Sequence, residues 1–231
     1  MQLIDKVVSL IAPHFCVVCG GEGSVLCDTC LAVAGEPPAP RCVGCKALSD
    51  GYKTCKSCRS WIDVYAVYVA TEYGGVYETL LHAYKFGLKR QAAEPMAAIM
   101  SQLNVDIIAT KLMVVAIPTA PARVRERGFD HGCLLARQYY RRLRRQLGDK
   151  VSYEAVLGRR TNKRQLGSSR TQRIRQVDGE FFVKDARRVA GSTILLTDDV
   201  TTTGASLAAA ARALKRAGAA RVYAVVYAQK V

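Results

Sequence analysis

Residues 194–207 read Ile-Leu-Leu-Thr-Asp-Asp-Val-Thr-Thr-Thr-Gly-Ala-Ser-Leu, and this stretch predicts a strand, a loop and a helix in succession. Its first residues, like Thr193 before them, are apolar or β-branched, which is typical of a strand buried on both faces of a parallel sheet. From Leu207 the chain consists almost wholly of strong helix formers, and Gly218 suits the C-cap of that helix. Because residues 221–228 then form another apolar run, the region predicts a β-loop-α-β unit.

Two adjacent carboxylates, Asp198 and Asp199, end the first strand, and a loop of small hydroxyl residues follows them. Two acids can bind the vicinal hydroxyls of a ribose, and a loop of this kind at a helix N-terminus can hold a phosphate. Open α/β sheets bind their ligands at this position, the carboxyl end of a strand. The residues therefore indicate a site for a ribose 5-phosphate. The alternative is an ordinary turn with N-capping aspartates, which rarely combines Asp-Asp with Thr-Thr-Thr-Gly-Ala-Ser.

Two other phosphate-binding motifs are absent from the sequence. It has no Gly-x-x-x-x-Gly-Lys-[Ser/Thr], which excludes a P-loop motif, and no Gly-x-Gly-x-x-Gly after a strand to support a dinucleotide site. Residues 194–207 instead resemble the phosphoribosyl-pyrophosphate (PRPP) binding motif of type I phosphoribosyltransferases. That resemblance implies an α/β fold with a sheet of this type flanked by helices.

The composition of the 231 residues is that of a protein with an ample core and a basic surface. Half of the residues are hydrophobic, and no run approaches the roughly 18 apolar residues of a membrane span. The first apolar run, residues 7–13, is too short and poorly flanked for a signal peptide, so we expect a cytoplasmic protein without membrane insertion.

The net charge of +15 is unevenly placed, with thirteen Lys or Arg against two acids between residues 137 and 175. Such a region attracts phosphate-rich partners, either nucleic acid or a polyphosphate ligand. A solvated helix face with a basic loop is the alternative. The residues that we single out as nucleic-acid candidates are Arg141, Arg142, Arg144 and Arg145.

Eight of the nine cysteines form four Cys-x-x-Cys pairs before residue 59. Because two such pairs complete a tetrahedral Cys₄ site, the spacing predicts two structural zinc ions in a small N-terminal module. A disulfide framework is the alternative, and it is disfavoured in a cytosolic chain. Tandem sites close the shorter loops, with residues 35–40 as a stiff spacer, while a cross-braced pairing remains open. The tandem ligand sets are Cys16, Cys19, Cys27 and Cys30, then Cys42, Cys45, Cys55 and Cys58.

The rest of the chain alternates apolar strands with helical patterns. We expect strands over residues 63–71, in a mixed sheet, over 112–117, and near 153–157 and 180–183, with helices over 76–84, 91–103 and 131–147. Cys133 reads as a thiol buried in the last of these helices rather than as a nucleophile. The basic segment 159–176 has no apolar pattern, so it is either a lid over the ligand or a surface excursion.

Over nearly its whole length the chain resembles the ComF/ComFC family, whose members join a Cys-x-x-Cys zinc module to a phosphoribosyltransferase-like domain. Family members often have Asn-Gln after Arg-Gly-Phe, where this chain has Asp130-His131, and Asn at the position of Gln176. Besides the cysteine pairs and residues 194–207, the resemblance rests on Lys85-Phe86-Gly87, Ile117-Pro118, Arg127-Gly128-Phe129, and Gln165 with Arg173 ahead of Gly179-Glu180-Phe181.

The resemblance implies a role for each part of the site. Asp198 and Asp199 would bind the ribose hydroxyls, and together with Lys85 they are the candidate catalytic residues. Magnesium would bridge the pyrophosphate of PRPP, because a compact dication neutralises its oxygens. The 5-phosphate would bind to Thr201, Thr202, Thr203, Gly204, Ala205 and Ser206, the pyrophosphate loop would be Pro118, Thr119 and Ala120, and the lid would carry Arg164, Gln165 and Arg173.

Three functions follow as hypotheses. The first is a PRPP-binding protein of natural transformation, which handles incoming single-stranded DNA with a DNA-uptake helicase or other competence proteins. The second is an active phosphoribosyltransferase of nucleotide metabolism, and the third is a zinc-dependent adaptor with an inert transferase fold. In each case we expect a helix and double zinc-knuckle module over residues 1–60 and a phosphoribosyltransferase-like domain over residues 61–231.

Overall fold

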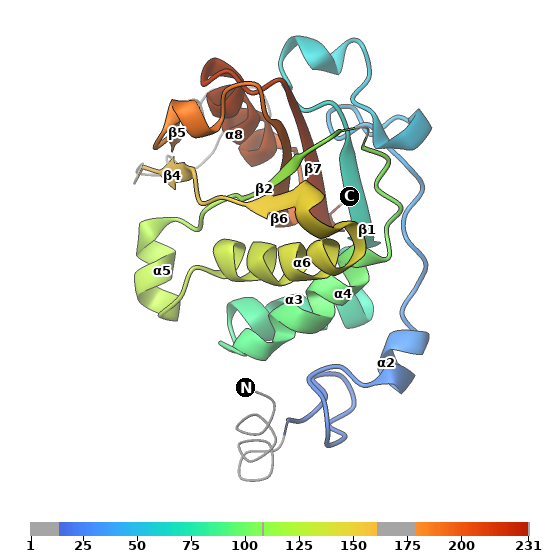
Figure 1. The fold of residues 1–231 in the computed structure, drawn as a ribbon. Helices are drawn as coiled ribbons and strands as arrows, with labels where there is room; N and C mark the ends of the chain where they lie inside the picture. The colour runs from blue at the N-terminus through green and yellow to red at the C-terminus, as the bar shows by residue number, and fades with distance from the viewer. Residues whose placement is uncertain (1–13, 108, 161–178, 231) are drawn as a thin grey trace, which may run out of the picture.

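The structure is a computed structural model that describes residues 14–107, 109–160 and 179–230 (Figure 1). At the centre of this described part lies a five-stranded sheet in the order β1-β7-β6-β2-β3. Every neighbouring pair in this sheet is parallel, so the expectation of a parallel α/β sheet is confirmed and that of a mixed sheet is wrong. The strands are β1 Val67–Glu72, β2 Leu112–Ala116, β3 Val151–Tyr153, β6 Thr193–Thr201 and β7 Arg221–Gln229.

Helices cover both faces of the sheet, which is why its strands are apolar throughout. Three helices lie on one face, below the sheet in Figure 1, and α8 lies on the other. Since side chains alternate along a strand, Leu195 of β6 packs toward the first group while Ile194 and Leu196 pack toward α8. The helices are α3 Gly75–Lys85, α4 Ala93–Ser101, α6 His131–Leu147 and α8 Ala205–Arg216.

The connections on the two faces of the sheet diverge between β2 and β6, which makes this pair of strands the topological switch point of the sheet. The chain leaves β2 through α6 on one face to reach β3, and it leaves β6 through α8 on the other face to reach β7. The two connections diverge at the carboxyl ends of these neighbouring strands, which is where open α/β sheets bind ligands. The pairing of Ala116 with Thr197 sets the loop after β2 beside Asp198 and Asp199.

Several local expectations need correction. A single strand near residues 153–157 is wrong, because β3 ends at Tyr153 in the main sheet and β4 begins a separate antiparallel pair with β5. The helix expected over 91–103 is a 3₁₀ turn followed by α4, and helix α5 was not expected, although Pro121 at its start and Gly128 after its end are typical helix signals. The remaining elements are α2 Asp28–Ala32, α5 Pro121–Arg127, β4 Leu157–Arg159, β5 Phe181–Val183, η1 Asp50–Tyr52, η2 Cys58–Ser60, η3 Arg90–Ala92, η4 Gly148–Lys150 and η5 Ala186–Arg188.

The two lobes that carry the cysteine pairs lie at opposite ends of the molecule, one at the bottom beside α2 and one at the upper right in Figure 1. Cys16 and Cys30 join the hydrophobic cluster of α3, α4 and α6, whereas Cys42 and Cys58 join that of α8. Between them residues 35–40 run along the domain, where the Tyr77 hydroxyl donates to the Gly35 carbonyl at 2.7 Å. Each lobe is therefore packed on its own face of the sheet.

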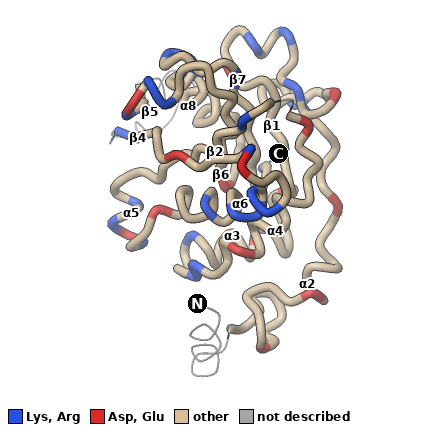
Figure 2. The backbone as a smooth tube through the Cα atoms, in the orientation of Figure 1, with Lys and Arg blue, Asp and Glu red and all other residues tan. Residues whose placement is uncertain are grey.

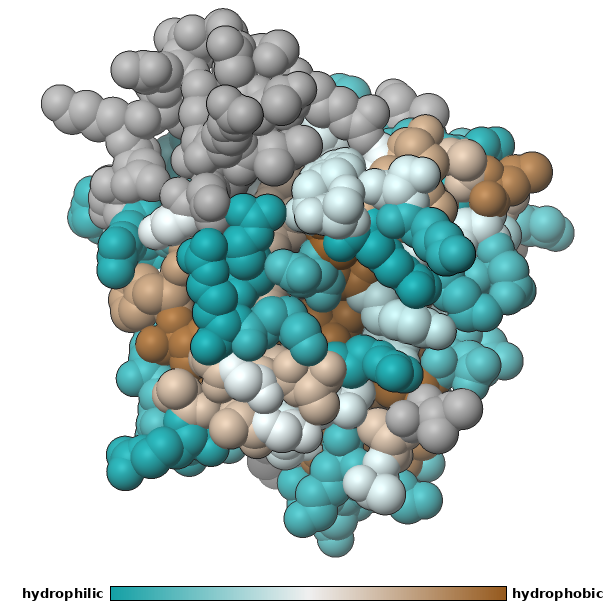
Figure 3. Space-filling model, turned by 90° about the horizontal axis from the view of Figure 1, so that it is seen from above, coloured by the Kyte–Doolittle hydropathy of each residue, from teal (hydrophilic) through white to brown (hydrophobic). Residues whose placement is uncertain are grey.

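The surface is mainly hydrophilic where Figure 3 shows it, with small apolar areas between polar side chains. Within the described ranges no helix is both long and apolar enough to cross a bilayer.

Candidate functional site

The two carboxylates of the sequence motif lie on β6, just beyond the last residue of that strand that pairs with β2. Adjacent residues of a strand face opposite sides, so Asp199 points toward α3 and α6 while Asp198 points the other way. Asp199 is 4% exposed, with its Oδ1 2.8 Å from Lys85 Nζ and its Oδ2 3.0 Å from His131 Nε2. The structure thus brings the candidate Lys85 from the end of α3 into direct contact with the motif.

The two adjacent carboxylates have opposite electrostatic environments. Burial opposes ionisation of Asp199, but the charge of Lys85 and the hydrogen bond from His131 outweigh it and hold the pKa of Asp199 well below its usual range. Burial and the neighbouring charge of Asp199 raise the pKa of Asp198 to about 7. At neutral pH the site therefore holds one permanently ionised carboxylate beside one that is close to its titration point.

Residues at the start of α6 contact both the loop after β2 and the Asp199 carboxylate. Asp130 caps the helix by accepting from the Cys133 backbone N–H at 3.0 Å, and it also accepts from the Thr119 hydroxyl at 2.7 Å. The next residue, His131, lies with its Nδ1 2.8 Å from a guanidinium nitrogen of Arg127. A proton-accepting Nδ1 leaves Nε2–H to donate to Asp199.

Asp130, His131 and Arg127 are thus site residues that the sequence did not single out as such. Asp130 and His131 occupy the positions at which this chain differs from the family that its sequence resembles. The sequence did contain a local signal for Asp130, because an aspartate just before a helical pattern is typical of a helix N-cap.

A glycine permits the close approach of α6 to β2. A Cβ at Gly132 would lie 2.2 Å from the Ile117 carbonyl oxygen, which is backbone and cannot swing aside. We therefore expect Gly132→Ala to displace the start of α6 and to lower the free energy of unfolding by about 2 kcal/mol. Chemical denaturation measures the loss, and an unchanged midpoint would contradict this packing.

The loop after β6 has the conformation expected of an anion site at a helix N-terminus. Gly204 is the N-cap of α8 with φ +76°, a left-handed conformation that favours glycine. The helix begins at Ala205, two residues earlier than the sequence predicted, and the Gly204 carbonyl accepts from Ala208 N at 2.9 Å. The backbone N–H groups of the first turn of a twelve-residue helix therefore begin within the motif.

A cavity of about 420 Å³ adjoins the loop after β2. Pro118 and Thr119 form part of its wall, and Arg125, Arg159 and Lys184 give it a cationic rim. Cys133 also lines it. This thiol is half-buried, and burial raises its pKa to about 11, which disfavours the thiolate form. The proposed lid residues Arg164, Gln165 and Arg173 lie outside the described residues.

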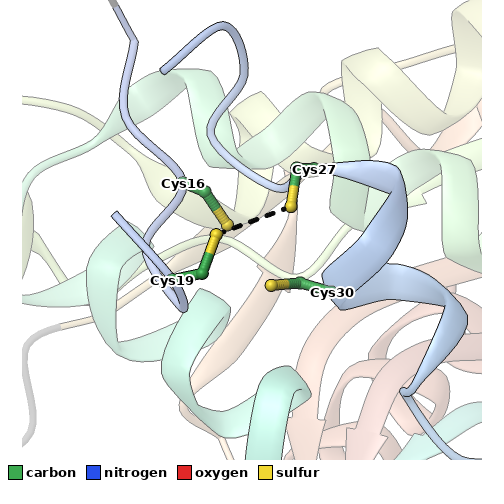
Figure 4. A group of neighbouring side chains, drawn as sticks. All are labelled: Cys16, Cys19, Cys27 and Cys30. Carbon is green, nitrogen blue, oxygen red and sulfur yellow. Dashed lines mark hydrogen bonds between the residues drawn. The ribbon is translucent and has the colours of Figure 1, made fainter. Parts of the chain in front are cut away.

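The eight paired cysteines form two groups with the geometry of metal sites. Within each group the four sulfur atoms lie within 4.8 Å of one another, and Figure 4 shows those of the first group converging. The nine cysteines all lie in the described part of the chain, and none forms a disulfide there. The groups are consecutive in sequence, as in the tandem arrangement: Cys16, Cys19, Cys27 and Cys30, then Cys42, Cys45, Cys55 and Cys58.

Zinc fits these groups. Four sulfurs at zinc–sulfur distances of about 2.3 Å in a tetrahedron are about 3.8 Å apart. The Sγ atoms of Cys19 and Cys27 are 3.7 Å apart, as are those of Cys45 and Cys55.

Basic residues recur along helix α6 (Figure 2), and the four arginines singled out as nucleic-acid candidates differ in their contacts. Arg142 forms an ion pair with Glu94, and Arg144 lies 2.8 Å from Asp149. Arg141 contacts Gln138, and Arg145 is exposed. Two of the four charges are therefore partly neutralised within the protein.

Comparison with known proteins gives a family match over the C-terminal part of the chain. Residues 129–231 match the family model described as a phosphoribosyl transferase domain. Among solved structures, the chain is similar to glutamine PRPP amidotransferase from B. subtilis complexed with ADP and GMP, with 16% identity and a TM-score of 0.40. That similarity covers 60% of this chain and 26% of the amidotransferase chain. A search of curated proteins gave no match. The sheet and the family match together show that the chain carries a phosphoribosyltransferase-type domain.

Proposed function

We propose that this protein binds PRPP, or a related phosphoribosyl ligand, together with Mg²⁺ at the switch point between β2 and β6. The observation that carries the proposal is the succession of Asp198, Asp199 and residues 202–206, which form the loop and the start of α8, at the point where the connections from these two strands diverge. A sugar diol and a terminal phosphate are the two groups that this arrangement suits.

Different residues of the site would bind the ribose, the 5-phosphate and the pyrophosphate of the ligand. Asp199, kept ionised by Lys85 and His131, can accept hydrogen bonds from a ribose hydroxyl. The first turn of α8 would hold the 5-phosphate, while the loop at Pro118 and Thr119 would face the pyrophosphate. Bound magnesium would neutralise pyrophosphate oxygens while keeping several waters.

A second candidate is catalysis of phosphoribosyl transfer, and the cavity of about 420 Å³ beside Thr119 favours it. In that reaction the bond from C1 of the ribose to pyrophosphate breaks, the pyrophosphate leaves with the electron pair, and an acceptor nucleophile bonds to C1. Positioning and charge stabilisation would provide the acceleration. Release of pyrophosphate in the presence of a panel of bases and amines would support this candidate, and binding without release would support a ligand-binding role.

Ligand affinity should depend on pH through Asp198. Its raised pKa of about 7 means that the carboxylate forms only as the pH passes 7, so affinity for ribose 5-phosphate should rise about tenfold from pH 6 to pH 8. Calorimetry across this range measures the slope. Because the ligand phosphate titrates as well, Asp198→Asn is the control, and equal slopes in both proteins would exclude Asp198 as the titrating group.

We also propose membership of the ComF family and a role in natural transformation, in which single-stranded DNA contacts the basic surface. Support comes from the four cysteine pairs, the motif 194–207 and the net charge of +15. A zinc-dependent adaptor with an inert fold remains the competing hypothesis, and it predicts no ligand binding.

DNA binding should be strong at low salt and fall steeply as salt rises, because lysine and arginine contacts release counterions from phosphates. Charge reversal of Arg141, Arg142, Arg144 and Arg145 should weaken binding and flatten the salt dependence, measured by fluorescence anisotropy with a single-stranded oligonucleotide. Unchanged binding would show that α6 is not the contact surface.

A further inference from the structure

The second cysteine lobe touches the loop that would hold the phosphate. Val43 lies between the ligands Cys42 and Cys45 and is 2% exposed. A Cβ at Gly204 would lie 2.8 Å from Val43 Cγ2, so this methyl group packs directly over the Gly204 backbone. Gly204 is the N-cap of α8 and belongs to the motif. One side chain of a metal-binding knuckle thus forms a wall of the phosphate loop.

The same lobe continues along α8. Cys42 and Cys58 share a hydrophobic cluster with buried residues of this helix, including Leu207 and Ala211. Farther along, Arg212 donates to the carbonyl of Trp61 at 3.1 Å. The lobe therefore contacts the N-cap of α8 through Val43 and a residue near its C-terminal end through Trp61.

The position of Val43 depends on how tightly its knuckle is folded. A Cβ at the next residue, Gly44, would lie 2.5 Å from Cys58 Sγ. The knuckle backbone therefore passes directly against a sulfur of its own Cys₄ group. An ion that holds the four sulfurs together would keep the Gly44 backbone against Cys58 Sγ, and it would thereby hold the Val43 methyl groups in place.

We propose that Val43 is a positioning residue for the phosphate loop, through which the second Cys₄ group supports binding of a sugar phosphate and the first does not. The proposal rests on the proposed ligand site and extends it to a residue that contacts no ligand. Without the Val43 side chain, the loop at Gly204 loses the packing that holds its left-handed conformation.

The first lobe supplies a matched control. Val17 follows Cys16 as Val43 follows Cys42, in the same Cys-Val-x-Cys arrangement. It packs on the opposite face of the sheet, against the cluster of α3, α4 and α6. Truncation of either valine removes the same atoms from equivalent places in a knuckle, but only one of the two adjoins the phosphate loop.

The test compares Val43→Ala with Val17→Ala in the full, zinc-loaded chain, with zinc content measured for both. We expect the dissociation constant for ribose 5-phosphate to rise about tenfold in Val43→Ala and to change less than twofold in Val17→Ala. Equal effects, or an unchanged dissociation constant in Val43→Ala, would overturn the proposal.

Hydrogen exchange without ligand gives a second readout. Amides 202–207 should exchange faster in Val43→Ala than in Val17→Ala, while those of β6 stay protected in both. If the wild type binds no ribose 5-phosphate, the proposed function fails, yet faster exchange would still show that Val43 holds the loop. Unchanged exchange at these amides would refute the positioning role by itself.

Discussion

Asp199→Asn should lower the thermal stability of the protein, whereas Asp198→Asn should raise it, although the residues are adjacent and each variant should bind the ligand more weakly than the wild type. The Asp199 carboxylate is the buried partner of Lys85 and His131, whose side chains are 14% and 12% exposed. Removing one partner of such a group leaves buried charge uncompensated, at a cost of about 3 kcal/mol. The melting temperature of a chain of this size should then fall by roughly 6–12 °C.

The ionised form of Asp198 is disfavoured by burial and by the charge of Asp199. Its raised pKa means that the folded state binds a proton more tightly than the unfolded state, so the destabilisation begins above about pH 4 and is complete above pH 7. Asparagine cannot ionise. At pH 8 we therefore expect Asp198→Asn to raise the free energy of unfolding by about 1 kcal/mol and the melting temperature by roughly 2–4 °C, while ligand affinity falls.

Thermal melts of the ligand-free variants at pH 4.5 and pH 8 measure both effects. Asp199 is ionised at both values because its pKa is lowered, so its substitution should destabilise in each buffer. The gain from Asp198→Asn should shrink at the lower pH. Shifts of the same sign for the two variants at pH 8 would contradict the opposite environments of these carboxylates.

Removal of zinc should open residues 14–60 before the sheet. These residues include both Cys₄ groups, and structural zinc contributes apparent binding energies of about 10–16 kcal/mol in small metal-dependent folds. The sheet retains its own apolar core on both faces. Hydrogen exchange in the presence of a chelator should therefore show loss of protection first in residues 14–60, with β6 and β7 persisting.

The contacts of the second lobe specify what should loosen next. Thr54 donates through its backbone N–H and its hydroxyl to the carbonyls of Tyr65 and Val64, just before β1. Protection of the amides from hydrogen exchange should then fall just before β1 and at residues 202–206. A single cooperative loss across the whole chain would show that the cysteine lobes and the sheet are one folding unit.

The sequence predicted the parts of the fold that depend on local patterns. Residues 194–207 specified strand, loop and helix because burial on both faces of a strand and helix propensity are both readable locally. Even there β6 runs on to Thr201, since pairing with β7 continues past the carboxylates. The tandem cysteine groups followed from loop lengths. Their location on opposite faces depends on tertiary packing that no local pattern records.

In the site, too, the residues that are contiguous in sequence could be predicted, and those brought in by tertiary packing could not. Asp198, Asp199 and the phosphate loop are contiguous and were identified together, and Lys85 was named through the family resemblance. The contacts of His131 and of Val43 join segments that are far apart in sequence, so only the folded chain brings them to the motif. Their residue types, an ordinary histidine and an ordinary valine, carry no chemical signal of their own.

Titration calorimetry with Mg-PRPP measures whether the protein binds a phosphoribosyl ligand through Asp198 and Asp199. We expect heat of binding with one ligand per chain for the wild type, and none for the Asp198→Asn/Asp199→Asn double variant once circular dichroism shows that it is folded. No heat from the folded, zinc-loaded wild type, or undiminished heat from the double variant, would contradict the assignment of the switch point between β2 and β6 as a phosphoribosyl site.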